Sequence, residues 1–184
     1  MSGTALAVIG DPIGHSRSPL MHAAALEVLG MHDVDYRAIH VRASDLRAFV
    51  ARDAVTAGLT GFNVTVPHKS SIMPMLHHVD PGAAQIGAVN TVYAMDDGWG
   101  GCNTDVIGFG DALDVLVGCP SEAVSGPPVV VLGAGGAARA VIAALCGRRW
   151  ATSVVWVTRD AGRLRDSGWP HPEAPHRVLS LIHI

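Results

Sequence analysis

Short apolar runs alternate along the chain with stretches in which apolar residues recur at helical spacing. The apolar runs predict strands over residues 5–9, 35–41 and 61–66. The helical spacing between them predicts a helix over 20–29 with Ser18 as its N-cap, and a helix over 44–57 opened by a Ser44 cap. Strands that alternate with helices predict an α/β fold with parallel strands.

The pattern changes after residue 66. Helical pieces are predicted over 69–77 and 81–86. Residues 88–95 and 99–103 predict a β-hairpin around the turn sequence Asp96-Asp97-Gly98. A further helix is predicted over 105–117. A stretch rich in Pro, Gly and Ser then covers 119–128 and predicts a boundary between two domains, 1–118 and 119–184.

The second domain opens on the sequence of a nucleotide-binding unit. Four apolar residues, 129–132, predict a buried strand, and a glycine turn, a helix to about Cys146 and a strand over 153–158 follow. The turn has the form G-x-G-x-x-A and is built from Gly133, Ala134, Gly135, Gly136 and Ala137, with Ala138 closing it. In this strand–turn–helix context it predicts dinucleotide binding, with the phosphates at the helix N-terminus. The alternative is a glycine turn that only packs a helix on a sheet.

The end of the strand over 153–158 discriminates between the two nicotinamide cofactors. NAD sites place an acidic side chain there, and NADP sites place basic groups. Thr158 is neutral, while Arg159 and Arg163 can bind a 2′-phosphate. Asp160 is the one residue that would repel it. The sequence favours NADP.

Composition excludes several classes of protein. The 184 residues are 49% hydrophobic and 16% charged, with a mean hydropathy of +0.31, so a substantial core is expected. The net charge of -3 and the lack of a basic run argue against nucleic acid as the main partner. No apolar stretch is long enough for a membrane span, and no signal peptide is recognisable. Three cysteines without metal spacing favour the cytoplasm, and no metal site is predicted.

The segment Gly61-Phe-Asn-Val-Thr-Val-Pro-His-Lys69 carries the first candidate chemistry. Side chains alternate along a strand, so Asn63 and Thr65 share one face while residues 62, 64 and 66 face a core. Together with the ammonium of Lys69, these groups suit a small polyhydroxylated anion on which a proton is moved. The alternative is a half-buried strand followed by a surface lysine.

Five motifs together resemble the shikimate dehydrogenase family. They are Gly10-Asp-Pro-Ile-Gly-His-Ser-Arg-Ser-Pro19, the segment 61–69, Gly87-Ala-Val-Asn-Thr91, Gly101-Cys-Asn-Thr-Asp105-Val-Ile-Gly108 and Gly133-Ala-Gly-Gly-Ala137. The resemblance covers nearly all of the chain. It implies a substrate-binding α/β domain followed by a Rossmann-type domain, and the NADPH-dependent reduction of 3-dehydroshikimate to shikimate on the way to chorismate and the aromatic amino acids.

The resemblance also assigns residues. Ser16 and Ser18 would bind the substrate carboxylate, although helix capping explains both equally simply. Asn63, Thr65, Asn90 and Asp105 would bind the ring hydroxyls. Lys69 and Asp105 would form the catalytic pair, with Lys69 delivering the proton. Of the ten histidines, His15 and His68 lie inside motifs and are interpreted as structural or as supporting the residues that contact the substrate.

The chain also departs from the family. Only the opening of the nucleotide domain is present, and residues 166–184 predict either a further strand over 178–184 or a tail foreign to the family. We therefore expect a truncated chain, as a monomer or homodimer. The alternatives are a quinate/shikimate or amino-shikimate dehydrogenase, which Ser18 and Thr158 disfavour, and a catalytically silent module that binds shikimate.

Overall fold

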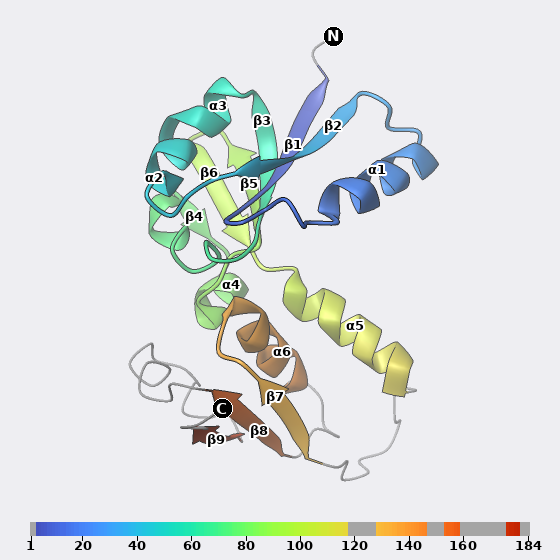
Figure 1. Ribbon diagram of the computed structural model, residues 1–184, viewed down its shortest axis with the longest axis vertical. Coiled ribbons are helices and arrows are strands. Elements are labelled where there is room, and N and C mark those ends of the chain that lie inside the picture. The colour runs from blue at the N-terminus through green and yellow to red at the C-terminus, as the bar shows by residue number, and fades with distance from the viewer. Residues whose placement is uncertain (1–2, 118–127, 147–152, 159–175, 181–184) are drawn as a thin grey trace. The chain divides into compact units, whose positions relative to one another are not determined.

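The protein is described by a computed structural model that covers residues 3–117, 128–146, 153–158 and 176–180. The chain divides into two compact units, Met1–Asn103 and Thr104–Ile184 (Figure 1). The division precedes helix α5 (Asp105–Val117), because Phe109 and Leu113 of this helix pack in the core of the second unit. The limits predicted from the sequence, 1–118 and 119–184, stay a prediction.

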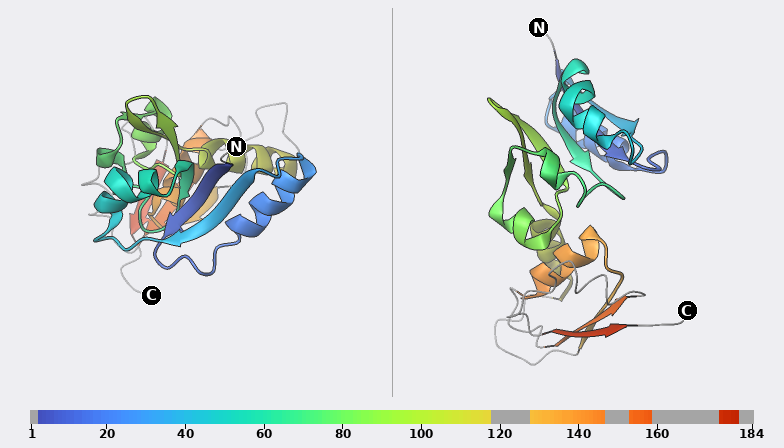
Figure 2. Two further views of the ribbon diagram at one scale, coloured as in Figure 1. Left: turned by 90° about the horizontal axis from the view of Figure 1, so that it is seen from above. Right: turned by 90° about the vertical axis from the view of Figure 1, so that its left-hand side faces the viewer.

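The first unit is built on a six-stranded sheet (Figure 2). Its strands are β1 (Thr4–Gly10), β2 (Val34–His40), β3 (Leu59–Val64), β4 (His78–Val79), β5 (Thr91–Met95) and β6 (Gly98–Cys102). The strand order is β2-β1-β3-β5-β6-β4. Strands β2, β1 and β3 are parallel, whereas β5 runs antiparallel to both β3 and β6. The predicted hairpin is therefore confirmed, although its first strand begins at Thr91.

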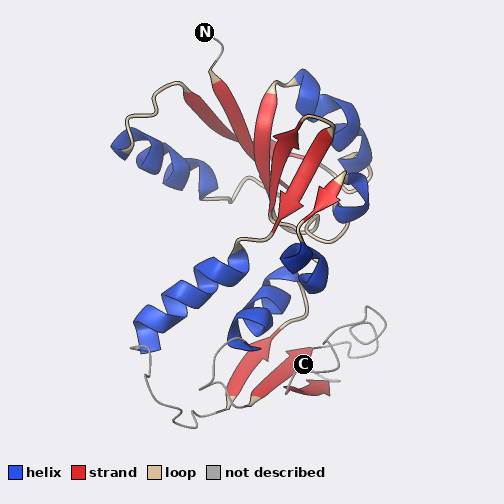
Figure 3. Ribbon diagram, turned by 180° about the vertical axis from the view of Figure 1, so that it is seen from behind, coloured by secondary structure: helices blue, strands red, loops and turns tan. Residues whose placement is uncertain are grey.

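Helices flank this sheet on both sides (Figure 3). On one side lies α1 (Ser18–Val28), and on the other lies a continuous helical segment made of α2 (Leu46–Ala48), the π-helical η1 (Phe49–Asp53) and α3 (Ala54–Thr56). The 3-10 turn η2 (Met73–Met75) and helix α4 (Pro81–Ile86) follow along the chain. In the described part of the chain, every helix is too short or too polar to cross a lipid bilayer.

The core of the first unit lies between the sheet and the segment α2–α3. The ring of Phe62 on β3 meets Phe49 edge-on at 5.5 Å and Trp99 at 5.3 Å between centroids. Helix α1, in contrast, has no buried residue. Apolar burial is therefore concentrated on one face of the sheet, and the opposite face carries the polar Tyr36 and Asn63 beside the buried Val8.

The second unit contains α5, β7 (Val129–Leu132), α6 (Gly136–Cys146), β8 (Val154–Thr158) and β9 (His176–Ser180). Its strands are all parallel and follow the order β7-β8-β9, as in the first half of a doubly wound nucleotide-binding sheet. The α/β fold class is confirmed. Strand β9 covers residues 176–180, so a strand is present where one was predicted over 178–184, and residues 181–184 lie outside the described residues.

Both predicted helix caps are wrong. Ser18 is the first residue of α1 and Arg17 is its N-cap, while the hydroxyl of Ser16 accepts a hydrogen bond from the Ser18 backbone N–H at 3.3 Å. The second helix begins at Leu46 with Asp45 as N-cap, and the Ser44 hydroxyl donates to the Asp45 carboxylate instead of the helix. Ser44 thus bonds a neighbouring side chain, and at the start of α1 it is Ser16, not Ser18, whose hydroxyl accepts from a backbone N–H.

The strand predicted over 61–66 is shifted by two residues, because β3 ends at Val64. Phe62 and Val64 are buried as expected, but the side chain of Val66 is 69% exposed, so its predicted core position is wrong. Alternation applies only within a sheet, and the chain has left the sheet before Val66. The helix predicted over 69–77 is also wrong, since helical geometry is confined to the turn Met73–Met75.

Candidate functional site

The end of β3 holds a chain of hydrogen-bonded polar side chains. The hydroxyl of Tyr36 on β2 donates to Asn63 Oδ1 at 2.7 Å, and Asn63 Nδ2 donates to Thr91 Oγ1 at 3.1 Å. The Thr91 hydroxyl donates in turn to Asn90 Oδ1 at 2.9 Å. Asn63 and Thr91 are partners in the β3–β5 register, so the sheet itself brings the two predicted asparagines together.

Thr65 follows directly after the strand and stays attached to β1. Its backbone N–H donates to the Ile9 carbonyl at 2.9 Å. A Cβ atom on Gly10 would lie 2.6 Å from the Thr65 methyl group, so only glycine permits this approach. Thr65 is half-buried at the same end of the sheet as Asn63.

Lys69 lies on a loop that is anchored on both sides. The carbonyl of Lys69 accepts a hydrogen bond from the Val89 N–H at 2.7 Å, next to Asn90. The preceding side chain, His68, is fully buried, and its Nε2 lies 2.6 Å from the Val41 carbonyl at the end of β2. His68 therefore fixes the backbone beside Lys69, in line with the structural role predicted for it. Lys69 is also the single lysine among the 13 Lys and Arg residues of the sequence. A basic residue type used only once could have marked this position as functional from the sequence alone.

Ser16 and Ser18 lie at the N-terminus of α1, which approaches the sheet through Tyr36. The Ser18 carbonyl accepts from the ring of His22 at 2.9 Å, and this ring stacks on Tyr36 with 3.9 Å between centroids. Burial raises the pKa of Tyr36 to about 12, although a hydrogen bond with the Ser18 side chain lowers it. Tyr36, Thr91 and His22 were not among the predicted site residues.

Asp105 belongs to the second unit, where it opens helix α5. A carboxylate in the first turn stabilises a helix through its dipole, which is a sufficient local reason for this residue. The predicted pairing of Asp105 with Lys69 stays a prediction.

The glycine turn of the second unit lies between β7 and α6 and leaves room for a ligand. Gly133 follows β7 with a φ of 105°, which favours glycine, and its carbonyl accepts a hydrogen bond from the indole N–H of Trp156. A Cβ atom on Gly135 would meet no atom within 4 Å, so the turn is open on that side. The turn leads into α6, whose first N–H groups are available for phosphate oxygens. These residues fit a pyrophosphate.

Only part of the predicted cofactor site at the end of β8 lies among the described residues. Thr158 is the last residue of the strand and is 7% exposed. Arg159 and Arg163, predicted to bind the 2′-phosphate, lie outside the described residues. Within the described ranges, no group of three or more His, Cys, Asp or Glu residues could hold a metal ion.

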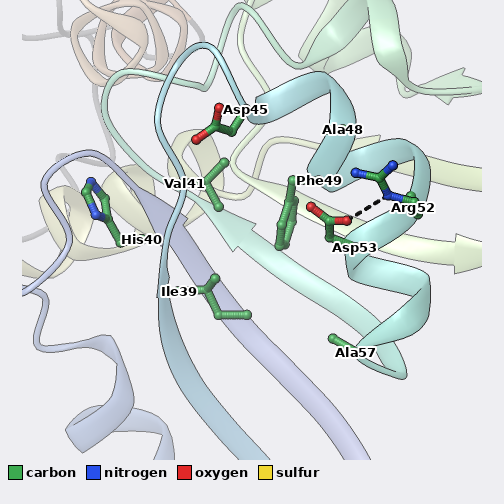
Figure 4. A pocket seen from close by; sticks show the side chains of 9 residues that line it. All are labelled: Ile39, His40, Val41, Asp45, Ala48, Phe49, Arg52, Asp53 and Ala57. Atoms are coloured by element: carbon green, nitrogen blue, oxygen red, sulfur yellow. Dashed lines mark hydrogen bonds and ion pairs between the residues drawn. The ribbon is translucent and has the colours of Figure 1, made fainter.

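One pocket of the first unit is lined by the end of β2 and by the helical segment α2–α3 (Figure 4). It has a volume of about 470 Å³ and is lined by Ile39, His40, Val41, Asp45, Ala48, Phe49, Arg52, Asp53 and Ala57. None of the predicted site residues lines it. Its rim includes the surface ion pair between Arg52 and Asp53, which are adjacent in sequence and 3.1 Å apart. An exposed ion pair of this kind contributes little to the free energy of folding. Because no predicted site residue lines the pocket, the pocket is not the candidate site.

Cys102 on β6 is a half-buried thiol of the first unit. Burial, with a smaller contribution from the charge of Asp80, raises its pKa. Because the thiolate is the reactive form of cysteine, this environment favours a packing role over a nucleophilic one.

Comparison with known proteins identifies the family. Residues 8–92 match the model of the shikimate dehydrogenase substrate binding domain. The chain belongs to the shikimate dehydrogenase family. Family members similar to it include the NADP(+)-dependent shikimate dehydrogenase of Synechococcus sp. (strain JA-3-3Ab), which is 49% identical over 138 residues. That match covers 74% of this chain and 44% of the Synechococcus protein, and the chain spans about half the length of the curated relatives it matches.

Solved structures of the family agree with the fold. Shikimate dehydrogenase from Aquifex aeolicus superposes with a TM-score of 0.81 at 33% identity, over 96% of this chain and 62% of that one. The enzyme from Thermus thermophilus, solved in complex with NADP(H) and shikimate, gives a TM-score of 0.78 at 38% identity, over 96% and 62% of the two chains. The resemblance stated from the five motifs is therefore confirmed.

Proposed function

We propose that this chain carries the substrate-binding unit and the opening of the nucleotide-binding unit of an NADP-dependent shikimate dehydrogenase. The reaction is the reversible reduction of 3-dehydroshikimate to shikimate, in the biosynthesis of chorismate and the aromatic amino acids. The observation that carries the proposal is the connected set Asn63, Thr91 and Asn90, with Thr65 at the same end of the sheet and the loop of Lys69 bonded beside Asn90. The family relationship supports it.

Each residue of the set has a role that follows from its chemistry. The hydroxyls of Ser16 and Ser18, at the start of a helix, favour the substrate carboxylate. Amide and hydroxyl groups of Asn63, Thr65 and Asn90 suit ring hydroxyls, which both donate and accept hydrogen bonds. We assign the remaining hydroxyl contact to Asp105.

Proton transfer falls to Lys69. NADPH, when bound, supplies the hydride that the ketone carbon accepts. Negative charge then develops on the carbonyl oxygen, and the ammonium of Lys69 stabilises this charge and donates its proton. In the oxidative direction the neutral amine takes the hydroxyl proton. Asp105 orients the lysine in this proposal.

The cofactor would be held by the turn from Gly133 to Ala137. The open side of Gly135 and the start of α6 support binding of the pyrophosphate. Thr158 supports NADP over NAD, because the last residue of β8 is neutral and does not itself repel a 2′-phosphate. The oligomeric state and the cytoplasmic location stay predictions.

Calorimetric titration of the chain tests the proposal. We expect both shikimate and NADP+ to bind, because each has its own set of residues in a different unit. An Asn63→Ala variant serves as control and should weaken shikimate binding while NADP+ binding is unchanged. Binding of shikimate without NADP+ would instead support a silent shikimate-binding module. Tighter binding of quinate than of shikimate would contradict the proposed substrate.

A further inference from the structure

Tyr36, on β2, joins two segments that carry proposed substrate contacts, α1 and β3. Its hydroxyl donates to Asn63 on β3, and the Ser18 side chain of α1 hydrogen-bonds to it. Its ring stacks on His22 with an interplanar angle of 5°. Because α1 has no buried residue, this cluster is a principal attachment of the helix to the sheet.

The hydrogen bonds around Asn63 leave a single orientation for its amide. The backbone carbonyl of Asn90 can only accept, and it lies 3.4 Å from the Asn63 nitrogen. The one proton of the Thr91 hydroxyl is given to Asn90 Oδ1, so Thr91 Oγ1 must accept from Asn63. Both constraints place the Asn63 nitrogen toward β5, and the Asn63 oxygen is left facing Tyr36.

We propose that Tyr36 is a positioning residue that makes Asn63 a hydrogen-bond acceptor toward the ligand. Both Asn63 N–H groups are directed to Thr91 and Asn90, while Oδ1 accepts from Tyr36 and keeps a second lone pair. This lone pair selects a ring hydroxyl that donates, and it disfavours a ligand with a ketone or hydrogen at that position. The inference rests on the proposed function, since shikimate is taken as the ligand.

Without the Tyr36 hydroxyl, the oxygen of Asn63 loses its fixed donor. The amide then keeps only its two N–H contacts to Thr91 and Asn90, so it is held less firmly and selection for one ligand hydroxyl weakens. A purely structural tyrosine would behave differently, because its loss would weaken all ligands of this site to the same extent.

The test measures affinities of the Tyr36→Phe variant for shikimate and for analogues that each lack one ring hydroxyl. We expect shikimate affinity to fall about fivefold, as for one neutral hydrogen bond. We also expect discrimination against one analogue alone to shrink by a similar factor. Tyr93→Phe is the matched control, since Tyr93 is the only other tyrosine of the sequence and should leave every affinity unchanged. Equal weakening of shikimate and all analogues would overturn the proposal.

A second variant tests the same hydrogen-bonded chain from the β5 side. Thr91→Val removes the hydroxyl that accepts from Asn63 and should reduce discrimination against the same analogue as Tyr36→Phe does. Reduced discrimination against a different analogue would count against the proposal.

A measurement without ligand separates the orientation of Asn63 from the proposed function. If the unaltered chain binds no shikimate, the proposed function fails, but the Asn63 side-chain amide still reports its orientation by NMR. Asn63 side-chain amide protons that exchange slowly with solvent in the unaltered chain and faster in Tyr36→Phe support the positioning role. Equal exchange rates in both chains overturn it.

Discussion

The Lys69→Met variant is expected to reduce 3-dehydroshikimate about 10²–10⁴ times more slowly than the unaltered protein, which is the range for loss of a general acid. Methionine keeps the length of the side chain but has no proton to donate. The rate is measured from the loss of NADPH absorbance. Shikimate affinity should change little, because the carboxylate and hydroxyl contacts remain.

The loop geometry makes this result interpretable. The backbone of Lys69 is held by the Val89 N–H, and its neighbour His68 is held by the Val41 carbonyl, so neither anchor uses the lysine side chain. Lys69→Arg is the informative control, because arginine keeps the positive charge but does not release its proton in proteins. Its turnover should be as low as that of Lys69→Met. A Lys69→Met variant with undiminished turnover would remove Lys69 from the mechanism.

The Trp99→Ala variant is expected to lower the free energy of unfolding of the first unit by about 3–5 kcal/mol. Trp99 is 6% exposed and packs edge-on against Phe62 on the strand that carries Asn63. Its indole N–H also donates to the Val50 carbonyl at 3.0 Å, which joins β6 to the helical segment. The variant therefore leaves a cavity and removes the hydrogen bond that the indole donates to the Val50 carbonyl.

Amide hydrogen exchange at Val64 and Val92 measures this loss, because both residues lie in strands of the first unit. Met95→Ala, at an exposed position of the same hairpin, is the control and should change stability by less than about 0.5 kcal/mol. Exchange in Trp99→Ala that is as slow as in the unaltered chain would show that the aromatic cluster does not hold this sheet together.

Elements with local stop signals could be predicted from the sequence. Helix α4 begins and ends where predicted, because Asp80 caps its start through the Gly82 N–H and Gly87 ends it with a φ of 70°. Helix α5 and strand β7 also match the predicted bounds. The end of β3 does not match its predicted position. The strand ends where its pairing with β1 ends, and no local sequence pattern encodes that pairing.

The same distinction holds for the candidate site. Asn63 and Asn90 were predicted from motifs, and they are connected through Thr91 because β3 pairs with β5. The role of Tyr36 could not be predicted, since its partner Asn63 is 27 residues away and only the order of the strands brings the two together. Long-range contacts of this kind decide how a side chain is oriented, while a motif decides only that it is present.

The most direct test of the account is the protection of Lys69 by shikimate. Because the chain has a single lysine, an amine-specific reagent can modify only Lys69 and the N-terminal amine, and mass spectrometry separates the two. The account predicts that saturating shikimate slows modification of Lys69 and leaves the N-terminal amine unaffected. Equal rates of Lys69 modification with and without shikimate would contradict it.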